Sequence, residues 1–393
     1  MKKILLVALS FAAAVSASAQ LTYLDSGNKD IYRHSLRATR GGRHEVVLPQ
    51  VNGYNVYKAD LHTHSIFSDG SVAPEYRVKE AWLDGLDVMA VTEHIEYRRH
   101  EPTFVKYLEN YEKKNVEAVN YDLINEPADK EGIKVDLNMV VELSQQAAAQ
   151  YGLLIIPGVE ITRHPKMIGH YNALFTTDNN TIYDADPLQS FRNAKAQGAL
   201  IQHNHPGWQR KSLDMPEFEV KAYAEGLIDG IEVMNGSDFY PGAIDRAKEL
   251  GLFMTANTDI HGTTAMDYAN VEVGRNMTLI FAKEKTLEAM REALEAHRTL
   301  AYAFGNVAGD EQLLKDFFLA CVKFEPVMKD YKNRQIFTIT NTSSIPFAFR
   351  IGGGNVVWLD PFSTISAKTN NIKITVENMW YGVDKHPVIE IKF

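Results

Sequence analysis

Cysteine is almost absent from this sequence. Cys321 is the single cysteine among 393 residues, so an internal disulfide is excluded. Proteins that function in oxidising compartments often use disulfides, and this one does not. A lone cysteine is more often a small buried hydrophobic residue than a reactive thiol. We therefore expect Cys321 to be a core residue.

Long basic runs are also lacking. The net charge is -9 and no cluster of Lys and Arg stands out. Binding to duplex nucleic acid depends on such clusters, because they displace counterions from the phosphates. We therefore do not expect duplex nucleic acid as a partner. A small phosphorylated substrate stays compatible with this charge, since metal ions can supply the positive charge that it needs.

One apolar run near the N-terminus has the length and flanks of a targeting segment. It extends from Ile4 to about Val15, follows Lys2-Lys3 and precedes Ala17-Ser18-Ala19. This order is typical of a secretory signal peptide that is cleaved near Ala19. The run is too short to cross a bilayer as a helix, and no later segment is apolar enough. We expect an exported protein, periplasmic or extracellular, without a membrane span.

Short apolar runs alternate with amphipathic stretches from Tyr57 to about Phe304. The expected strands are Val56–Leu61, Asp87–Val91, Leu153–Ile156, Tyr171–Phe175, Ala199–Gln202, Gly230–Val233 and Phe253–Ala256. The expected helices are Pro74–Asp84, Leu137–Tyr151, Pro187–Gln197, Gly242–Leu250 and Thr286–His297. Such alternation predicts a parallel α/β sheet, and this many repeats can close into a barrel. Residues 96–136 break the rhythm and are predicted to be an insertion over the barrel mouth.

The pattern of alternating strands and helices ends at about Asp310. A short helix is expected at Glu311–Leu319, followed by strand-like segments at Arg334–Asn341, Phe347–Ile351, Ser366–Ile374 and Val388–Phe393. This pattern predicts a small all-β sandwich, with a role in packing or in a homo-oligomer. The expected organisation is a signal peptide (1–19), an N-terminal arm (20–50), an α/β barrel (51–308) and the β-sandwich (309–393).

Histidines and carboxylates gather at the ends of the predicted strands, where α/β barrels carry their working face. His62 and His64 alternate with Thr63, so an extended backbone directs both imidazoles to one side. Two imidazoles on one face suit a transition-metal ion. Asp259 and His261 share a face in the same way. These two pairs are the first candidate ligands.

Further candidate ligands lie next to other predicted strands. They are Asp69, His94, Glu160, His170 and His205. His170 fits the pattern least well, because it precedes its strand instead of following it. A single histidine at a strand end is more often a hydrogen-bonded structural residue than a ligand. Burying so many imidazoles and carboxylates together without a cation would be costly, however. The whole set therefore predicts a metal site.

These motifs resemble the PHP superfamily, named for polymerase and histidinol phosphatase. The resemblance covers about residues 57–305 and rests, in family order, on HTHSIFSDG (62–70), TEH (92–94), PGVE (157–160), HYNAL (170–174), HNHP (203–206) and TDIH (258–261). Residues 77–82, 85–87 and 96–97 are similar to an exported phosphodiesterase branch. The resemblance implies a distorted (β/α)7 TIM-like barrel that holds two or three divalent metal ions.

The resemblance also implies how the ligands are shared. The first metal would be held by His62, His64, Glu160 and Asp259; the second by Glu160, His170 and His205; the third by Asp69, His94 and His261. Asp69 stands where some family members carry histidine. His203 either supports a ligand or is structural, and Glu93 is a candidate for orienting a ligand or a bound water.

An imidazole-rich site with carboxylates suits Zn, Mn or Fe better than Ca or Mg alone. Clustered metals favour phosphoester hydrolysis, because they activate water and neutralise phosphate charge. Glu160, Asp259, His205 and His261 are therefore the expected catalytic residues, with ligation as their first role. Arg163 is the preferred substrate-binding residue, ahead of Arg98, Arg99, Arg210 and Lys211. Tyr97 and Trp208 are candidates to flank a substrate group.

The sparse cations favour a small phosphodiester, because a monoester dianion usually needs more positive charge. A phosphomonoesterase of the same superfamily is the alternative. Amide hydrolysis is disfavoured, because no strand-end lysine stands out as a carbamylated ligand. A non-catalytic metal- or phosphate-binding module is the remaining alternative, and turnover of a bis(aryl) phosphate with and without chelator separates it from the enzymes.

Overall fold

The computed structural model of the chain describes residues 42–98, 100, 136–162, 168–268, 274–371 and 373–391, with short pieces between residues 23 and 34. The chain divides into two units, residues 1–43 and 44–393. The first unit contains one antiparallel pair, β1 (Tyr23–Leu24) and β2 (Arg33–His34). The predicted signal peptide and most of the predicted insertion lie outside the described residues.

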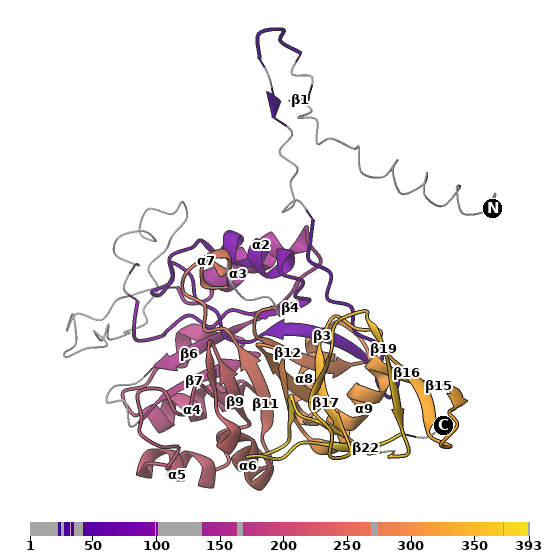
Figure 1. The fold of residues 1–393 in the computed structure, drawn as a ribbon. Helices are drawn as coiled ribbons and strands as arrows, with labels where there is room; N and C mark the ends of the chain where they lie inside the picture. Colours follow the sequence, from indigo (N-terminus) through magenta and orange to yellow (C-terminus); the bar gives the residue numbers. More distant parts are fainter. Residues whose placement is uncertain are drawn as a thin grey trace. The chain divides into compact units, whose positions relative to one another are not determined.

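A seven-stranded sheet in the second unit has the order β21-β14-β13-β12-β3-β4-β5. Figure 1 labels the strands β3, β4 and β12 of this sheet. Its strands are β3 (Asn55–Asp60), β4 (Val88–Ala90), β5 (Leu154–Ile156), β12 (Met277–Ala282), β13 (Thr299–Ala303), β14 (Asn306–Gly309) and β21 (Met379–Trp380). The β3, β4 and β5 strands are parallel, whereas β12 is antiparallel to both β3 and β13. Every residue of β4 and β12 is buried, which explains their continuous apolar runs.

A six-stranded sheet has the order β10-β9-β8-β7-β6, with β11 paired to β9. Its strands are β6 (Gly158–Thr162), β7 (His170–Leu174), β8 (Leu200–His203), β9 (Gly230–Asn235), β10 (Asp238–Phe239) and β11 (Phe253–Asn257). Here β7 is antiparallel to both β6 and β8. The expectation of an all-parallel sheet is wrong at this point. The connection from Thr162 to His170 is too short for the crossover that parallel strands require.

The two sheets meet at the strand ends. Isolated bridges join Thr63 to Ile260 and His94 to Glu160. The mixed α/β class predicted from the sequence is confirmed. Among the described residues, the strand ladders form two sheets and do not close into one continuous barrel.

The helices connect successive strands. They are α2 (Pro74–Leu83), α3 (Met139–Ala149), α4 (Pro187–Ala196), α5 (Glu217–Ala224), α6 (Pro241–Leu250), α7 (Thr264–Asp267) and α8 (Leu287–Glu295), with a 3-10 turn η2 (Asn179–Thr181). Helices α2, α4 and α6 each have proline in the first turn, where the missing N–H costs nothing. Gly251 ends α6 in the left-handed conformation. The sequence pattern did not predict α5 and α7, nor the strands β6, β12, β13 and β14. No helix in the described part of the chain is long and apolar enough to cross a bilayer.

The C-terminal segment begins with α9 (Glu311–Cys321) and continues into two antiparallel sheets. One has the order β15-β16-β19 and the other β18-β17-β20-β22. Their strands are β15 (Val322–Lys329), β16 (Gln335–Asn341), β17 (Phe347–Ile351), β18 (Val357–Leu359), β19 (Thr364–Thr369), β20 (Lys373–Val376) and β22 (Val388–Glu390). The single strand expected at Ser366–Ile374 is wrong, because the chain turns between β19 and β20.

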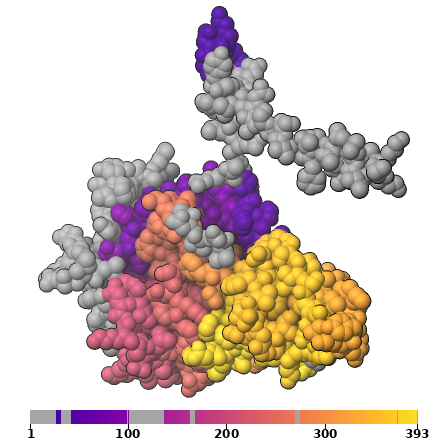
Figure 2. Space-filling view, in the orientation of Figure 1, coloured from indigo at the N-terminus to yellow at the C-terminus, as the bar shows by residue number. Residues whose placement is uncertain are grey.

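The C-terminal segment shares a hydrophobic core with the first sheet. The Phe281 ring of β12 packs at 90° against Phe317 of α9, with ring centroids 6.1 Å apart. The same buried cluster includes Phe337 and Phe347, and also Cys321, which is a core residue as expected. On the surface, the C-terminal residues form one continuous region (Figure 2). The β21 strand also pairs with β14, so this segment completes the first sheet.

Candidate metal centre

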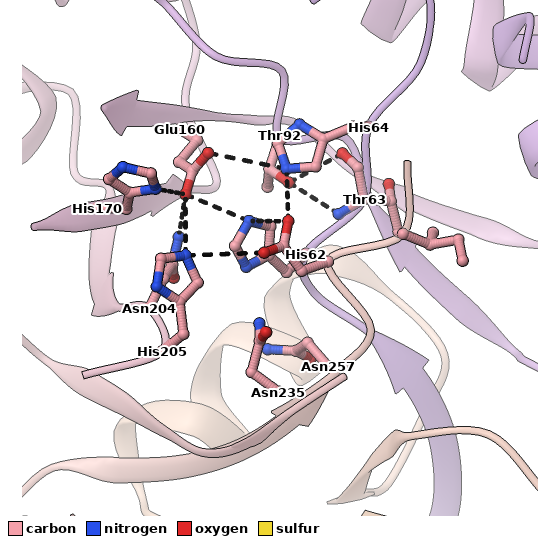
Figure 3. Close-up of polar contacts among 12 residues, drawn as sticks. His62, Thr63, His64, Thr92, Glu160, His170, Asn204, His205, Asn235 and Asn257 are labelled. Carbon is pink, nitrogen blue, oxygen red and sulfur yellow. Dashed lines mark hydrogen bonds and ion pairs between the residues drawn. The ribbon is translucent and has the colours of Figure 1, made fainter. Parts of the chain in front are cut away.

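The strand ends bring distant ligand candidates together. His62 and His64 follow β3, Glu160 lies within β6, and His205 follows β8 (Figure 3). Because β7 runs antiparallel to β6 and β8, its first residue, His170, lies at the edge where β8 ends and β6 carries Glu160. The placement of His170 before its strand is therefore consistent with a common site.

Glu160 lies at the middle of one set of contacts. Its Oε1 atom is 3.3 Å from Nε2 of His62 and 3.4 Å from Nδ1 of His170. Its Oε2 atom is 3.7 Å from Nε2 of His64. Oδ1 of Asp259 lies 3.2 Å from Nε2 of His62 and 3.0 Å from Nε2 of His64. Both oxygens of Glu160 thus face imidazoles, as a carboxylate bridging two cations would.

Asp69 is the centre of a second set. Its Oδ1 atom is 3.4 Å from Nε2 of His94 and 3.2 Å from Nε2 of His261. The His64 ring stacks on both of these histidines, with centroid distances of 4.4 Å and 4.3 Å. Nδ1 of His94 is also 2.5 Å from Oε2 of Glu160, so the two sets are contiguous.

The potential ligand atoms fall into overlapping groups, within each of which they lie no more than 4.8 Å apart. The groups are His64-Asp69-His94-His261, His62-His205-Asp259, His62-His64-Glu160 and Glu160-His170-His205. Each ligand predicted from the sequence belongs to at least one group. The structure places His64 with the Asp69 group as well as with Glu160, which the resemblance alone did not imply.

Three buried atoms of this centre make no hydrogen bond with the described residues. They are Nε2 of His62, Nε2 of His64 and Oδ1 of Asp69. Buried polar atoms in folded proteins nearly always have a partner, so such a cluster calls for one. A divalent cation accepts lone pairs from imidazole nitrogen and carboxylate oxygen alike. The donor set therefore fits a metal centre of Zn, Mn or Fe type.

The pKa values of the histidines reflect the demand for positive charge. Burial lowers the pKa of His62 and His94, but the surrounding carboxylates outweigh it and raise both pKa values well above normal. Burial also opposes protonation of His261, whose pKa is nevertheless raised to about 9 by Asp69 and Asp259. A metal cation at this centre would meet the same demand for positive charge.

Burial dominates at two other histidines. It lowers the pKa of His64 to about 3 and that of His205 to about 4. Both imidazoles are therefore neutral at physiological pH, which is the form that binds metal. His205 and Asp259 also have positive φ angles, 26° and 54°. Such backbone strain in residues other than glycine is concentrated at functional sites.

Glu232 is a buried site residue that the sequence analysis missed. Its Oε1 atom lies 2.9 Å from Nδ1 of His62, and its Oε2 atom accepts a 2.7 Å hydrogen bond from the backbone N–H of His205. The Asn257 amide donates to Oε1 at 2.9 Å. Glu232 is fully buried in β9, and its contacts orient the ligand candidates His62 and His205. A carboxylate inside the apolar strand GIEVMN was the available signal.

Glu93 and His203, two residues left open by the sequence, have different surroundings. Glu93 accepts hydrogen bonds from Ser65 and Ser68, and Oγ of Ser68 lies 3.4 Å from Nδ1 of His64. Glu93 thus holds the loop that carries His64. Nδ1 of His203 instead lies 2.8 Å from the hydroxyl of Tyr223, outside all four ligand groups. Of its two alternatives, His203 fits the structural one.

A pocket adjoins the centre on the side of His170 and His205. Gly169, His170, His203, Asn204, His205, Trp208 and Arg210 line it. The Trp208 ring packs against His170 and His205 with centroid distances of 5.2 Å and 5.4 Å. The Arg210 guanidinium contacts the buried carboxylate of Glu219, which fixes its position.

The other predicted substrate contacts are not among the described residues that line this pocket. Arg163 and Arg99 lie outside the described residues. Arg98 is buried and Lys211 is exposed. The Tyr97 ring lies 5.8 Å from that of His94.

An α/β fold in which imidazoles and carboxylates meet at the strand ends is typical of metal-binding proteins. Residues 60–292 match the model of the PHP domain. The chain belongs to the PHP family, as its motifs predict. Among curated proteins, none has a matching sequence.

A crystal structure from Bacteroides vulgatus is similar over nearly the whole length. It has 33% sequence identity and a TM-score of 0.77, and the match covers 89% of this chain and 99% of that one. That protein is described as a two-domain protein containing a predicted PHP-like metal-dependent phosphoesterase. The match extends beyond the PHP domain, so the C-terminal segment has a counterpart in that protein.

Two more distant structures match about half of the chain. One, from Bifidobacterium adolescentis, has 14% identity and a TM-score of 0.36, and the match covers 52% of this chain and 88% of that one. The other, an amidohydrolase from Chromobacterium violaceum with bound sulfate, has 14% identity, a TM-score of 0.35 and coverage of 52% and 87%. At these scores neither bears on the function of this chain.

Proposed function

We propose that this protein is a metal-dependent phosphoesterase that hydrolyses phosphodiester bonds of small substrates. The observation that carries the proposal is the set of overlapping ligand groups around Glu160, with its orphaned buried atoms on His62, His64 and Asp69. The description of the Bacteroides vulgatus relative as a predicted PHP-like metal-dependent phosphoesterase supports the same reaction class.

The residues present would hold two or three divalent ions. When bound, such ions lower the pKa of a water molecule and neutralise charge on phosphate oxygens. Glu160 is placed to be shared between neighbouring ions, because each of its oxygens faces different histidines. His205 and His261 serve first as ligands. His261 is also the ligand candidate most open to solvent, with a side chain 39% exposed, so it is the better placed of the two to exchange a proton.

The pocket beside His170 and His205 is the proposed binding place for the substrate. Of the described residues that line it, Arg210 alone carries a permanent charge. One guanidinium matches the single negative charge of a phosphodiester better than the dianion of a monoester. Trp208 offers an apolar face to the group attached to phosphate. The alternative, a phosphomonoesterase, would place a dianion beside the same metal ions, where the described pocket lining adds one guanidinium.

The remaining organisation is proposed on the sequence pattern. Residues 51–308 would form a distorted (β/α)7 barrel in which the two sheets are the halves of the wall, and residues 309–393 a β-sandwich. The signal-like segment supports export after cleavage near Ala19. Exposed apolar residues on the C-terminal sheets, among them Met328 and Trp358, support a homo-oligomer formed there. N-terminal sequencing and light scattering of the secreted protein test the last two points.

Hydrolysis of a bis(aryl) phosphate beside the corresponding aryl monophosphate tests the function, each with and without chelator. We expect turnover of the diester, its loss with chelator, and its recovery with Mn or Zn. His62→Ala and Asp259→Ala should abolish turnover while circular dichroism stays unchanged. Preference for the monoester would favour the alternative, and binding of metal without any turnover would favour a binding module.

A further inference from the structure

A buried arginine behind the metal centre ties together two of its loops. Arg77 lies in α2 and is only 2% exposed. Its Nε donates a 3.0 Å hydrogen bond to the carbonyl oxygen of His64. Its Nη2 donates to the carbonyl oxygen of Gly262 at 2.7 Å and lies 3.3 Å from those of Ile260 and His261. One guanidinium thus spans the loop after β3 and the loop after β11.

Glu80 extends this connection. Nη1 of Arg77 donates to Oε2 of Glu80 at 2.8 Å, one helical turn further along α2. Oε1 of Glu80 accepts a 2.8 Å hydrogen bond from the backbone N–H of Thr264. The pair therefore contacts the second loop at its carbonyls and again at the start of α7. Burial of both charges is compensated within the pair and by the loop backbone.

The loops joined by Arg77 carry most of one ligand group. His64 and Asp69 lie in the first loop and His261 lies in the second, and these residues form one group with His94. The two loops also touch directly, because the Ser71 N–H donates to the carbonyl oxygen of His261 at 2.8 Å. Arg77 bonds only to backbone oxygens of these loops, so the imidazoles remain available as ligands.

We infer that Arg77 is a positioning residue that sets the spacing of the metal site formed by Asp69, His94 and His261. The inference rests on the proposed metal centre. A guanidinium has its donors in a rigid planar fork, so it fixes the separation of the carbonyls that it joins. Without it the two loops keep their direct contacts and the contact of Glu80 to Thr264, which fix the distance from the oxygen of Asp69 to the imidazole of His261 less tightly.

The other ligand groups have separate supports. Glu232 holds His62 and His205, and the Asn204 amide donates to Oε1 of Glu160 at 2.9 Å. Arg275, another buried arginine, contacts Asp60. Asp60 in turn accepts from the backbone N–H of His62, at 3.3 Å. Loss of Arg77 should therefore affect the Asp69 site most, because the Glu160 side keeps these supports and shares only His64 and Asp259 with the two loops.

The test is the metal content of Arg77→Met and Arg77→Lys, measured by mass spectrometry after removal and reloading with Mn or Zn. Titration calorimetry gives the affinities, and anomalous scattering from crystals locates each ion. We expect Arg77→Met to lose the ion next to Asp69, or to bind it about 10- to 100-fold more weakly, while the remaining ions stay bound. Arg77→Lys keeps the charge without the fork and should restore affinity only in part. Arg192→Met, at an exposed arginine, is the control.

Unchanged affinity and occupancy next to Asp69 in Arg77→Met would overturn the inference. Equal loss of all ions together with a lower melting temperature would also overturn it, because Arg77 would then be a general structural residue. A wild-type protein with no ion next to Asp69 contradicts it as well. A wild-type protein that binds these ions but hydrolyses no phosphoester refutes the proposed function alone, and the metal contents still decide the role of Arg77.

Discussion

Nδ1 of His62 lies 2.9 Å from Oε1 of Glu232, and both side chains are fully buried. The contact leaves Nε2 of His62 directed at Glu160 and Asp259, where it makes no hydrogen bond with the described residues. A carboxylate behind an imidazole fixes the tautomer and orientation of the ring and raises its basicity. Glu232 therefore prepares His62 for ligation without belonging to a ligand group itself.

Glu232→Gln is expected to weaken metal binding about 10- to 100-fold, since an amide neither holds the imidazole as firmly nor increases its basicity. Competition with a fluorescent chelator measures the affinity. Glu217→Gln removes a carboxylate from an exposed surface pair and serves as the control. Equal affinities for Glu232→Gln and wild type would show that His62 does not depend on this contact.

Arg210→Met is expected to raise KM for the diester by about 10- to 100-fold, the loss of ~1.5–3 kcal/mol from a charge-assisted hydrogen bond. Inhibition by inorganic phosphate should weaken in parallel, while metal content stays unchanged. Steady-state kinetics at several phosphate concentrations provides both values. A variant with wild-type KM and wild-type phosphate inhibition would place the substrate elsewhere.

The site next to Asp69 should bind metal more weakly as the pH falls. The pKa of His261 is raised to about 9, so below that pH the ring holds a proton that metal must displace. The His261 ring alone should lower the affinity by up to about tenfold for each pH unit below 9, with one proton released from that ring per ion bound, and His94, whose pKa is also raised, adds to the decline. Calorimetry in buffers of different ionisation enthalpy counts the protons. His261→Gln should lose this released proton; if it does not, another group carries it.

Cys321 should react with thiol reagents only after unfolding. It is completely buried, and burial raises the pKa of its thiol to about 12, so thiolate is scarce at neutral pH. Because α9 shares a core with the first sheet, labelling in guanidinium should follow the same transition as far-ultraviolet circular dichroism. Labelling at lower denaturant than the loss of secondary structure would mean that the C-terminal segment unfolds separately.

The sequence predicted the strands β3, β4, β5, β7, β8, β9 and β11 to within a few residues from their short apolar runs, but it missed β6, β12, β13 and β14. It also selected the residues of the ligand groups, since two histidines separated by one residue leave a recognisable pattern. It could not predict the reversed direction of β7, which depends on the length of an irregular connection. Glu232 was missed because its role depends on His62, which is distant in the chain. Likewise, the role of Arg77 could not be predicted, because its backbone partners lie in loops that are distant in the chain.

The metal centre is the central claim, and anomalous scattering from crystals grown with Mn or Zn tests it most directly. The account predicts at least two neighbouring ions, roughly 3.5–4 Å apart, with Glu160 between them and imidazoles of His62, His64 and His205 as ligands. Crystals in which these side chains bind no ion, or in which the rings face away from one another while metal binds elsewhere, would contradict it.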